Sequence, residues 1–262
     1  MPAGELERIA TRAGDRLLSY FGRLSTADAT RKGNQRRDLV SEADVAAEEL
    51  ILGAIPPGES VLAEESGERS GDGRHWVVDP LDGTINFLHG IPFWCVSLAT
   101  ISDGELTAAV VHAPALAMTF AAERGGGATL NGDAMRVSGV GTIGDSILAT
   151  GFPYARDTLA DNNLDNVAPL GLVAGGLRRM GSAALDLAFT AAGKLDGFWE
   201  LHLNAWDIAA GTLLVREAGG SVTDFRGRAE LGRVLYGRHI VASNGHVHAA
   251  ILERLAPLRD LD

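Results

Sequence analysis

The sequence predicts a mixed α/β protein in which helices and sheets stack in layers. The first 145 residues contain β-rich runs separated by hairpin signals, which is typical of an antiparallel sheet. From residue 146 onward, short strand-like runs alternate with helix-like segments. The chain has 262 residues, of which 46% are hydrophobic, enough for one sizeable core. We therefore expect a single domain over residues 1–262, with an N-terminal α+β half (1–145) and a C-terminal α/β half (146–262).

Two helices are expected before the first sheet. Residues 3–22 carry an apolar stripe at i, i+3 and i+4 spacing. A polar, basic stretch at residues 31–37 is predicted to be a loop. The second helix follows Ser41, a suitable N-cap, and residues 56–58 (Pro-Pro-Gly) end it. Its buried face is predicted to carry Val45, Ala46, Leu50 and Ile51.

Residues 76–87 (WVVDPLDGTINF) predict a strand, a sharp turn and a helix. Val77 and Val78 suit a strand, whereas Pro80 cannot continue a central ladder. Thr84 is expected to be the N-cap of the helix that follows.

This turn also brings two acidic side chains together. Asp79 and Asp82 repel each other unless a cation lies between them. Mg²⁺ takes oxygen ligands and usually keeps waters that phosphate can replace. The N–H groups of Gly83 and Thr84, at a helix start, suit an anion. A solvated surface turn would use the same residues, so this stretch alone leaves both interpretations open.

The remaining elements follow from apolar runs and turn residues. Residues 61–63 form a short strand that ends in Glu64 and Glu65, and residues 67–74 are expected to be an exposed loop. Further strands are predicted at residues 94–101, 106–111, 118–122, 147–149, 196–200, 221–222 and 240–241. Further helices are predicted at residues 164–172, 183–192 (opened by Ser182), 206–217 and 246–256.

Composition restricts the partners and the compartment. With 23 basic and 34 acidic residues the net charge is −11, which argues against non-specific nucleic-acid binding. No apolar run approaches the roughly 20 residues of a membrane span, and the N-terminus does not resemble a secretory signal. Cys95 is the only cysteine, so we expect no intrachain disulfide and a cytoplasmic location. An acidic protein that handles phosphate needs a local positive charge, which bound metal would supply.

Three blocks of sequence together resemble the inositol monophosphatase family of Mg²⁺-dependent phosphatases. They are Ala63-Glu64-Glu65-Ser66, residues 76–87, and residues 206–211 (WDIAAG) with residues 217–220 (EAGG). Their order and spacing match the family over nearly the whole chain. The resemblance implies a layered αβαβα sandwich of the inositol monophosphatase and fructose-1,6-bisphosphatase type. It also implies inhibition by lithium and a homodimer.

The resemblance further implies two or three Mg²⁺ ions in each active site, with Mn²⁺ able to replace them. Glu64, Asp79 and the main-chain carbonyl of Leu81 are similar to the ligands of the first ion. Asp79, Asp82 and Asp207 are similar to the ligands of the second, with Asp79 bridging the two. Glu64 would also face a weaker third ion.

The same resemblance assigns the catalytic and substrate-binding residues. Asp44 and Thr84 would orient and deprotonate the attacking water, and Glu64 counts as catalytic because it faces the third ion. Gly83 and Thr84 would hold the phosphate through N–H groups. The residues expected to contact the substrate are Asp82, Gly83, Thr84, Gly181, Ser182, Ala183, Glu200 and Asp207, of which Gly181, Ser182, Ala183 and Glu200 match the positions that contact polyol hydroxyls.

The chemistry of the blocks agrees with these roles. Two metal ions about 3.5–4 Å apart can stabilise the incoming and leaving oxygens of an in-line displacement and can acidify a bound water. The blocks contain no cysteine or histidine, which favours direct attack by water over a covalent intermediate. We therefore expect hydrolysis of a small phosphorylated polyol, with myo-inositol 1-phosphate as the first candidate.

Three alternatives stay open beside this hypothesis. The substrate could be histidinol phosphate, fructose 1,6-bisphosphate or a nucleotide 3′-phosphate, because relatives with these activities share the metal blocks. The chain could be a non-catalytic scaffold that binds metal or a partner. Asp44 could be only a first-turn helix acid, and Asp207 only an N-cap. A calcium loop is disfavoured because Asp79 and Asp82 do not follow its alternating pattern.

One position departs from the family. A lysine often stands five residues before the Asp-Leu-Val segment, on a loop beside the metals. Here that position is Gly33, with Lys32 adjacent to it. Either the loop shifts by one residue or the lysine contact is absent.

Overall fold

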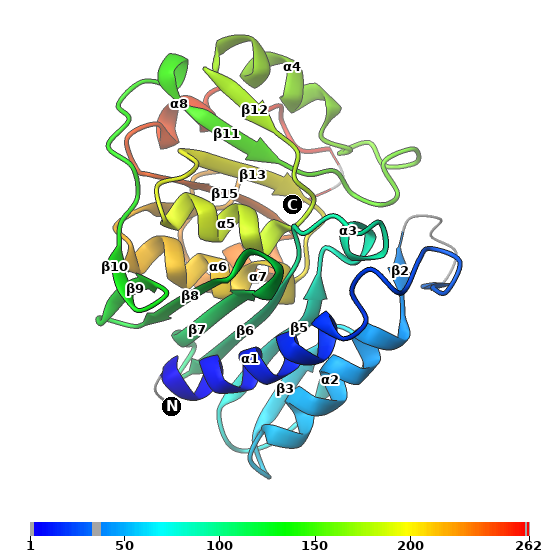
Figure 1. The fold of residues 1–262 in the computed structure, drawn as a ribbon. Helices are drawn as coiled ribbons and strands as arrows, with labels where there is room; N and C mark the ends of the chain where they lie inside the picture. Colours follow the sequence, from blue (N-terminus) through cyan, green and yellow to red (C-terminus); the bar gives the residue numbers. More distant parts are fainter. Residues whose placement is uncertain (1–2, 33–37, 260, 262) are drawn as a thin grey trace.

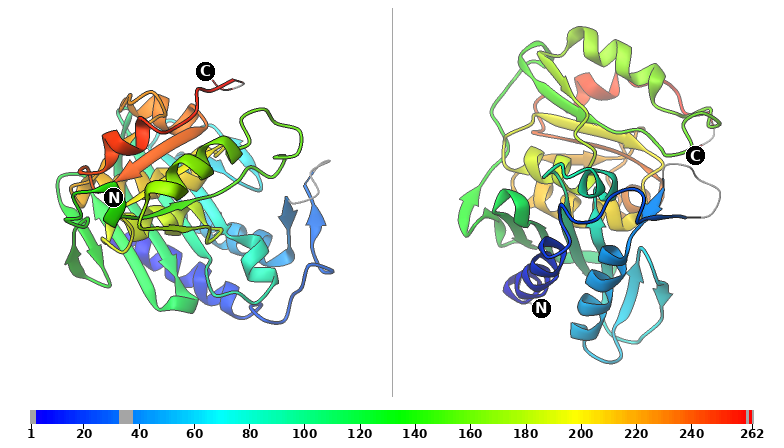
Figure 2. Two further views of the ribbon diagram at one scale, coloured as in Figure 1. Left: turned by 90° about the horizontal axis from the view of Figure 1, so that it is seen from above. Right: turned by 45° about the vertical axis from the view of Figure 1, so that its right-hand side comes forward.

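Helices and sheets alternate in five layers in the computed structural model, which describes residues 3–32, 38–259 and 261 (Figure 1). The outer helices on one side are α1 (Ala3–Leu18) and α2 (Glu42–Ala54), and those on the other are α4 (Leu164–Val173) and α8 (His248–Leu252). Between the two sheets lie α5 (Ala183–Ala191) and α6 (Ala205–Glu217). The turned views in Figure 2 show the same order of layers. The αβαβα architecture expected from the resemblance is confirmed.

The larger sheet has eight strands in the order β10-β9-β8-β7-β6-β5-β3-β4. Adjacent strands of this sheet are antiparallel, except for β3 and β5, which are parallel. The β6–β7 loop consists of Asp103 and Gly104, both with positive φ, as a two-residue hairpin requires. The strands are β3 (Ser60–Ala63), β4 (Gly67–Arg69), β5 (His75–Asp82), β6 (Cys95–Ser102), β7 (Glu105–Ala113), β8 (Met118–Glu123), β9 (Gly127–Leu130) and β10 (Asp133–Met135).

The smaller sheet has five strands in the order β12-β11-β13-β15-β14. Strand β11 is parallel to both of its neighbours, whereas β15 is antiparallel to both of its own. The strands are β11 (Ile147–Thr150), β12 (Gly176–Arg178), β13 (Gly197–Leu201), β14 (Ser221–Thr223) and β15 (His239–Ser243). Shorter elements are the pair β1 (Thr30–Arg31) and β2 (Leu39–Val40), the helices α3 (Thr84–Leu88) and α7 (Leu231–Tyr236), and the 3₁₀ helices η1 (Pro114–Leu116) and η2 (Ile143–Asp145).

The central helices are apolar around most of their circumference because a sheet covers each side. Helices α5 and α6 supply thirteen of the buried residues of the largest core cluster, and seven of these are alanines. At the closest approach of the two helices, a Cβ on Gly211 would lie 2.4 Å from Leu187 Cβ. Small side chains therefore allow two helices to fit side by side between the sheets.

Some local predictions were wrong, and the reasons are physical. Strand β4 lies inside the predicted loop at residues 67–74, because it pairs with β3 at the sheet edge. Strand β12 and helix α7 were not predicted. Val45 is 45% exposed, and α2 instead turns Asp44 and Glu48 inward, where they accept hydrogen bonds from backbone N–H groups. The predicted loop at 31–37 falls mostly outside the described residues, since only Arg31 and Lys32 belong to them.

The helices of the described part of the chain give no membrane-spanning candidate, because none of them combines sufficient length with sufficient apolar character.

Candidate active site

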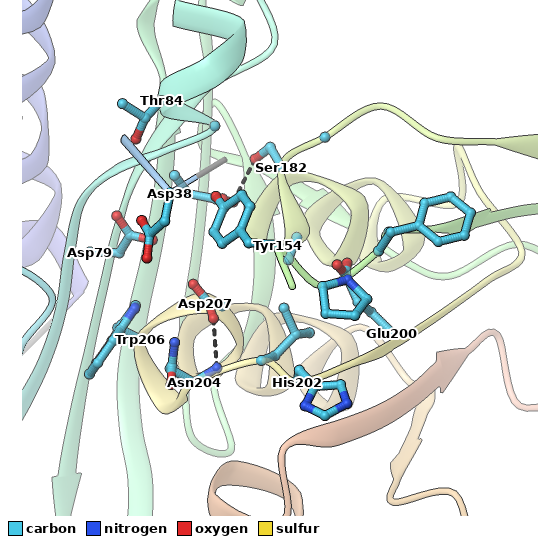
Figure 3. A pocket seen from close by; sticks show the side chains of 18 of the residues that line it. Asp38, Asp79, Thr84, Tyr154, Ser182, Glu200, His202, Asn204, Trp206 and Asp207 are labelled. Atoms are coloured by element: carbon cyan, nitrogen blue, oxygen red, sulfur yellow. Dashed lines mark hydrogen bonds between the residues drawn. The ribbon is translucent and has the colours of Figure 1, made fainter. Parts of the chain in front are cut away.

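A cavity of about 370 Å³ lies where β5, α5 and α6 meet the loop that follows β11 (Figure 3). Its volume suits a small metabolite. Seven acidic residues contribute to its lining, and they come from distant parts of the chain. They are Asp38, Glu64, Asp79, Asp82, Asp186, Glu200 and Asp207.

The end of β5 supplies the first two carboxyl groups of the cavity. Asp79 pairs with Ser97 in the ladder with β6, and the register then shifts before Asp82. The Leu81 N–H donates to Asp79 Oδ1 (3.0 Å), which turns the chain back toward the carboxyl. The predicted turn is therefore present, although the strand runs through Pro80 to Asp82.

Glycine is required at the step from this strand into α3. Gly83 has φ +92°, and a Cβ there would lie 3.0 Å from the Phe93 carbonyl oxygen. It is also the N-cap, so Thr84 is the first helical residue and not the cap that the sequence predicted. Gly83 and Thr84 both line the cavity.

Asp44 and Thr84 lie in contact although forty residues separate them. The Thr84 hydroxyl is 3.1 Å from both Asp44 Oδ1 and the Leu81 carbonyl oxygen, so it can donate to either. Asp44 Oδ2 accepts hydrogen bonds from the Ser41 N–H (2.8 Å) and hydroxyl (2.7 Å). Burial raises the pKa of Asp44 to about 6, although the Ser41 hydrogen bonds oppose the rise. Asp44 can therefore accept a proton close to neutral pH.

Burial and neighbouring charges raise the pKa values of four carboxyl groups at this end of the cavity, those of Glu64, Asp79, Asp82 and Asp207. The pKa of Asp79 is well above its ordinary value because of burial and then the charges of Glu64, Asp82 and Asp207. Burial raises the pKa of Asp82 to about 6, against hydrogen bonds from Ser182 and Ala184. The pKa of Asp207 is well above its ordinary value because of burial and then the charges of Asp82 and Glu64. Figure 3 shows that Asp79 and Asp207 reach this space from different elements.

The donor set of these four residues fits a hard divalent cation. It consists of crowded carboxylate oxygens, which repel each other unless positive charge is added, and such cations prefer oxygen ligands. Individual oxygens are held by the protein: Asp82 Oδ2 by the Ser182 hydroxyl (2.6 Å) and Ala184 N–H (2.7 Å), and Asp207 Oδ2 by the Asn204 N–H (2.6 Å). As the side chains stand, no three His, Cys, Asp or Glu residues among 3–32, 38–259 and 261 form a ready-made metal cage.

A lysine ammonium reaches this cluster from the β1 side. Lys32 Nζ lies 2.7 Å from Glu64 Oε1 and 2.7 Å from Glu65 Oε1. These contacts and the field of the two carboxylates raise the pKa of Lys32 despite its burial. Lys32 therefore contacts the acids, as the sequence left open, whereas Gly33 lies outside the described residues.

The turn that carries Glu64 is fixed by a buried acid that sequence reasoning missed. Glu48 on α2 is 3% exposed, and its two oxygens accept the N–H groups of Glu65 (2.9 Å) and Ser66 (2.8 Å). Its spacing of four residues from Asp44 places both acids on one helix face, which is the signal that could have found it.

The residues predicted to bind the polyol line the same cavity at its other end. Glu200 is 9% exposed, and burial raises its pKa to about 8, against the charge of Arg179. Its carboxyl lies against the backbone of Gly151, where a Cβ would come within 2.1 Å of Glu200 Oε1. Gly181, Ser182 and Ala183, at the start of α5, complete this end.

Further lining residues had no sequence signal. The loop after β11 contributes Phe152, Pro153, Tyr154, Ala155 and Leu159, and its sequence has no periodic pattern. Tyr154 lies next to Asp38 in Figure 3, and the charges of both Asp38 and Asp207 act on it.

Comparisons with known proteins identify the family to which the chain belongs. The inositol monophosphatase family model matches residues 5–260. An inositol-1-monophosphatase of Rhizobium meliloti is 45% identical over 248 residues, covering 92% of this chain and 91% of the relative. A Pseudomonas aeruginosa protein named Nus factor SuhB is 44% identical over 261 residues, covering 95% and 94%. The solved structure of inositol monophosphatase from Anabaena (Nostoc) superimposes with a TM-score of 0.85 and 35% identity, covering 98% of this chain and 96% of the other.

The match along almost the whole chain and the shared layered fold lead to one assignment: the chain belongs to the inositol monophosphatase family of metal-dependent phosphatases.

Proposed function

We propose that the protein is a Mg²⁺-dependent phosphatase that hydrolyses the monoester of a small polyol, with myo-inositol 1-phosphate as the preferred substrate. The observation that carries the proposal is the composition of one cavity. At one end it holds Glu64, Asp79, Asp82 and Asp207. At the other end it holds a buried Glu200, which can accept hydrogen bonds from hydroxyl groups. The 45% identical relative named inositol-1-monophosphatase supports the choice of substrate.

The metal-binding residues of this proposal are those expected from the sequence. Glu64, Asp79, Asp82, Asp207 and the carbonyl of Leu81 would hold two or three Mg²⁺ ions, which Mn²⁺ could replace. When bound, the ions would supply positive charge for the phosphate and lower the pKa of a water.

The protein's own groups would position the nucleophile and the phosphate. The Thr84 hydroxyl lies between Asp44 Oδ1 and the Leu81 carbonyl oxygen. It would accept a hydrogen bond from the attacking water, take up the proton that the water loses, and give its own hydroxyl proton to Asp44. The raised pKa of Asp44 (about 6) matches this acceptor role near neutral pH. The N–H groups of Gly83 and Thr84 would bind phosphate oxygens.

The alcohol part of the substrate would lie against α5 and β13. Ser182 and Ala183 begin α5, Gly181 precedes them with φ +91°, and Glu200 faces them across the cavity. Neutral Glu200 could donate as well as accept, which suits a ligand with several hydroxyls.

The activity assay follows phosphate release from myo-inositol 1-phosphate with and without Mg²⁺. We expect turnover only with the metal, inhibition by lithium, and a loss of at least about 100-fold in kcat for Asp82→Asn. Asp103→Asn, which removes an exposed charge in the β6–β7 turn, is the matched control. Metal-independent turnover, or full activity in Asp82→Asn, would refute the proposal. Histidinol phosphate, fructose 1,6-bisphosphate and a nucleotide 3′-phosphate in the same assay test the substrate by kcat/KM.

A second candidate function is a role in partner binding, because the 44% identical Pseudomonas relative is named a Nus factor. The net charge of −11 favours a protein partner over non-specific contact with nucleic acid. Complementation of a bacterium that lacks its SuhB would separate the two functions. Rescue by wild type and by Asp82→Asn alike would favour the partner role, whereas rescue by wild type alone would favour catalysis.

We also propose that the protein is a homodimer in the cytoplasm, an expectation carried over from the family and from its single cysteine, which is buried. Sedimentation equilibrium would measure the mass in solution, and a monomer at micromolar concentration would contradict the dimer.

A further inference from the structure

A buried carboxyl at the polyol end of the cavity has no assigned role. Asp186 lies in the first turn of α5, is 1% exposed and lines the cavity. Within the residues that the structure describes, its Oδ1 has no hydrogen-bond partner. Three other buried side-chain atoms share this condition, on Trp94, Thr212 and His239, but none of them lines the cavity and none belongs to a carboxyl.

An unsatisfied buried carboxyl is costly for the fold. Buried polar groups in native proteins nearly always find a partner, and a carboxyl that lacks one destabilises the folded state. Burial raises the pKa of Asp186 well above its usual range, and the charges of Glu200 and Asp82 raise it further. The charge of Arg179 partly offsets this rise. The described part of the fold thus leaves Asp186 Oδ1 without a hydrogen-bond partner, although the residue lines a ligand cavity.

Two carboxyl groups reach the cavity from different elements at this point. Glu200 projects from β13, and its carboxyl is held against the Gly151 backbone. Asp186 projects from α5, which packs directly on β13. Both residues line the same cavity, and the charge of Glu200 contributes to the raised pKa of Asp186. Together they present two separate hydrogen-bonding groups to whatever lies between them.

We propose that Asp186 determines specificity by hydrogen-bonding a hydroxyl group on the alcohol part of the substrate, beside the hydroxyl that Glu200 contacts. This inference rests on the proposed phosphatase function and deepens it. A site with two such groups selects a polyol over a simple alcohol, because a ligand without hydroxyls leaves both carboxyls buried and unpaired.

The test compares two esters that share a six-membered ring. Myo-inositol 1-phosphate carries ring hydroxyls, whereas cyclohexyl phosphate carries none. Asp186→Leu replaces the carboxyl by an apolar group of the same branched shape, and Asp103→Asn serves as the surface control. We expect Asp186→Leu to lower kcat/KM for inositol phosphate roughly 10- to 100-fold and for cyclohexyl phosphate less than threefold. Equal losses on both esters, or no loss on either, would overturn the proposal.

A stability measurement separates this role from a structural one. Because leucine removes an unpaired buried group, the Tm of Asp186→Leu should equal or exceed that of wild type, and a Tm lowered by more than about 5 °C would indicate a structural role instead. If the leucine variant does not fold, Asp186→Asn carries the test, since its amide keeps the shape. It should lose roughly 3- to 10-fold on inositol phosphate alone, and an unselective loss would overturn the proposal.

A binding arm distinguishes failure of this inference from failure of the proposed function. Calorimetry measures the affinity for inositol 1-phosphate in the presence of Ca²⁺, and needs no turnover. If wild type hydrolyses neither ester, the phosphatase proposal fails, and a tenfold weaker affinity in the Asp186 variant would still support hydroxyl recognition. Equal affinity of the two proteins, or no binding by wild type, would overturn it.

Discussion

Replacing Glu200 by glutamine should reduce the loss of stability that the protein suffers as the pH rises from 5 to 8.5. Burial raises the pKa of Glu200 to about 8, against an ordinary value of 4.5. Above pH 4.5 the unfolded chain releases this proton while the folded protein keeps it, so the folded state loses relative stability until the pH exceeds the folded pKa. At about 1.4 kcal/mol per pH unit, the separation of the two pKa values corresponds to at most about 5 kcal/mol.

The assay is urea denaturation of wild type and Glu200→Gln in a chelating buffer at pH 5 and pH 8.5. The other buried acids contribute to both proteins, so the difference between the two pH dependences isolates Glu200. Its charge also raises the pKa of Asp186, which makes the variant still less sensitive to pH. We expect the free energy of unfolding to fall between the two pH values by several kcal/mol less in the variant. Parallel pH dependences would refute the idea that Glu200 is held neutral by burial.

Three further perturbations test the cluster and the cavity wall. Mg²⁺ at about 100 times its Kd should stabilise wild type by about 2.7 kcal/mol and raise its Tm by roughly 5–10 °C. In thermal melts Asp82→Asn should lose most of this shift. An unchanged wild-type Tm would contradict a cation site. Lys32→Met removes the ammonium that lies 2.7 Å from Glu64 Oε1, so Tm without metal should fall by a few degrees while the shift induced by Mg²⁺ grows. An equal shift in both proteins would show that Lys32 does not compete with the metal. Gly151→Ala places a Cβ within 2.1 Å of Glu200 Oε1, which must displace the Glu200 carboxyl from its position in the cavity. The KM for inositol 1-phosphate should therefore rise roughly tenfold at nearly constant Tm. An unchanged KM would contradict the contact.

The parts of the fold that sequence predicted are those with local causes. The hairpin at Asp103 and Gly104 follows from residues that tolerate positive φ, and the turn after β5 follows from Gly83, which also has positive φ. Each signal lies within a few residues of its effect. The same holds for the start of α5 at Ser182, whose hydroxyl accepts the Leu185 N–H (3.3 Å).

The failures arise where a distant residue decides the outcome. The apolar pattern placed Val45 in the core, but α2 turns Asp44 and Glu48 inward because they hold the Ser41 and Glu65 backbone. In the site, Ser182 donates to Asp82 from one hundred residues away, and no window of sequence contains both. Asp186 was unremarkable in the sequence for the same reason, since only the assembled cavity shows that its carboxyl is buried and unpaired.

The starts of α5 and α6 have a consequence for how a protein of net charge −11 can attract an anion. Both helices begin on the cavity wall, at Ser182 and Asn204, so the positive ends of two backbone dipoles face the ligand. Unlike lysine or arginine side chains, these partial charges cannot be deprotonated, swing away or be removed by substitution. Because Ser182 at the start of α5 is buried, ionic strength should weaken the attraction of this helix end for phosphate less than it weakens a surface basic patch. The starts of these two helices thus add fixed partial positive charge to a cavity that is lined by acidic side chains.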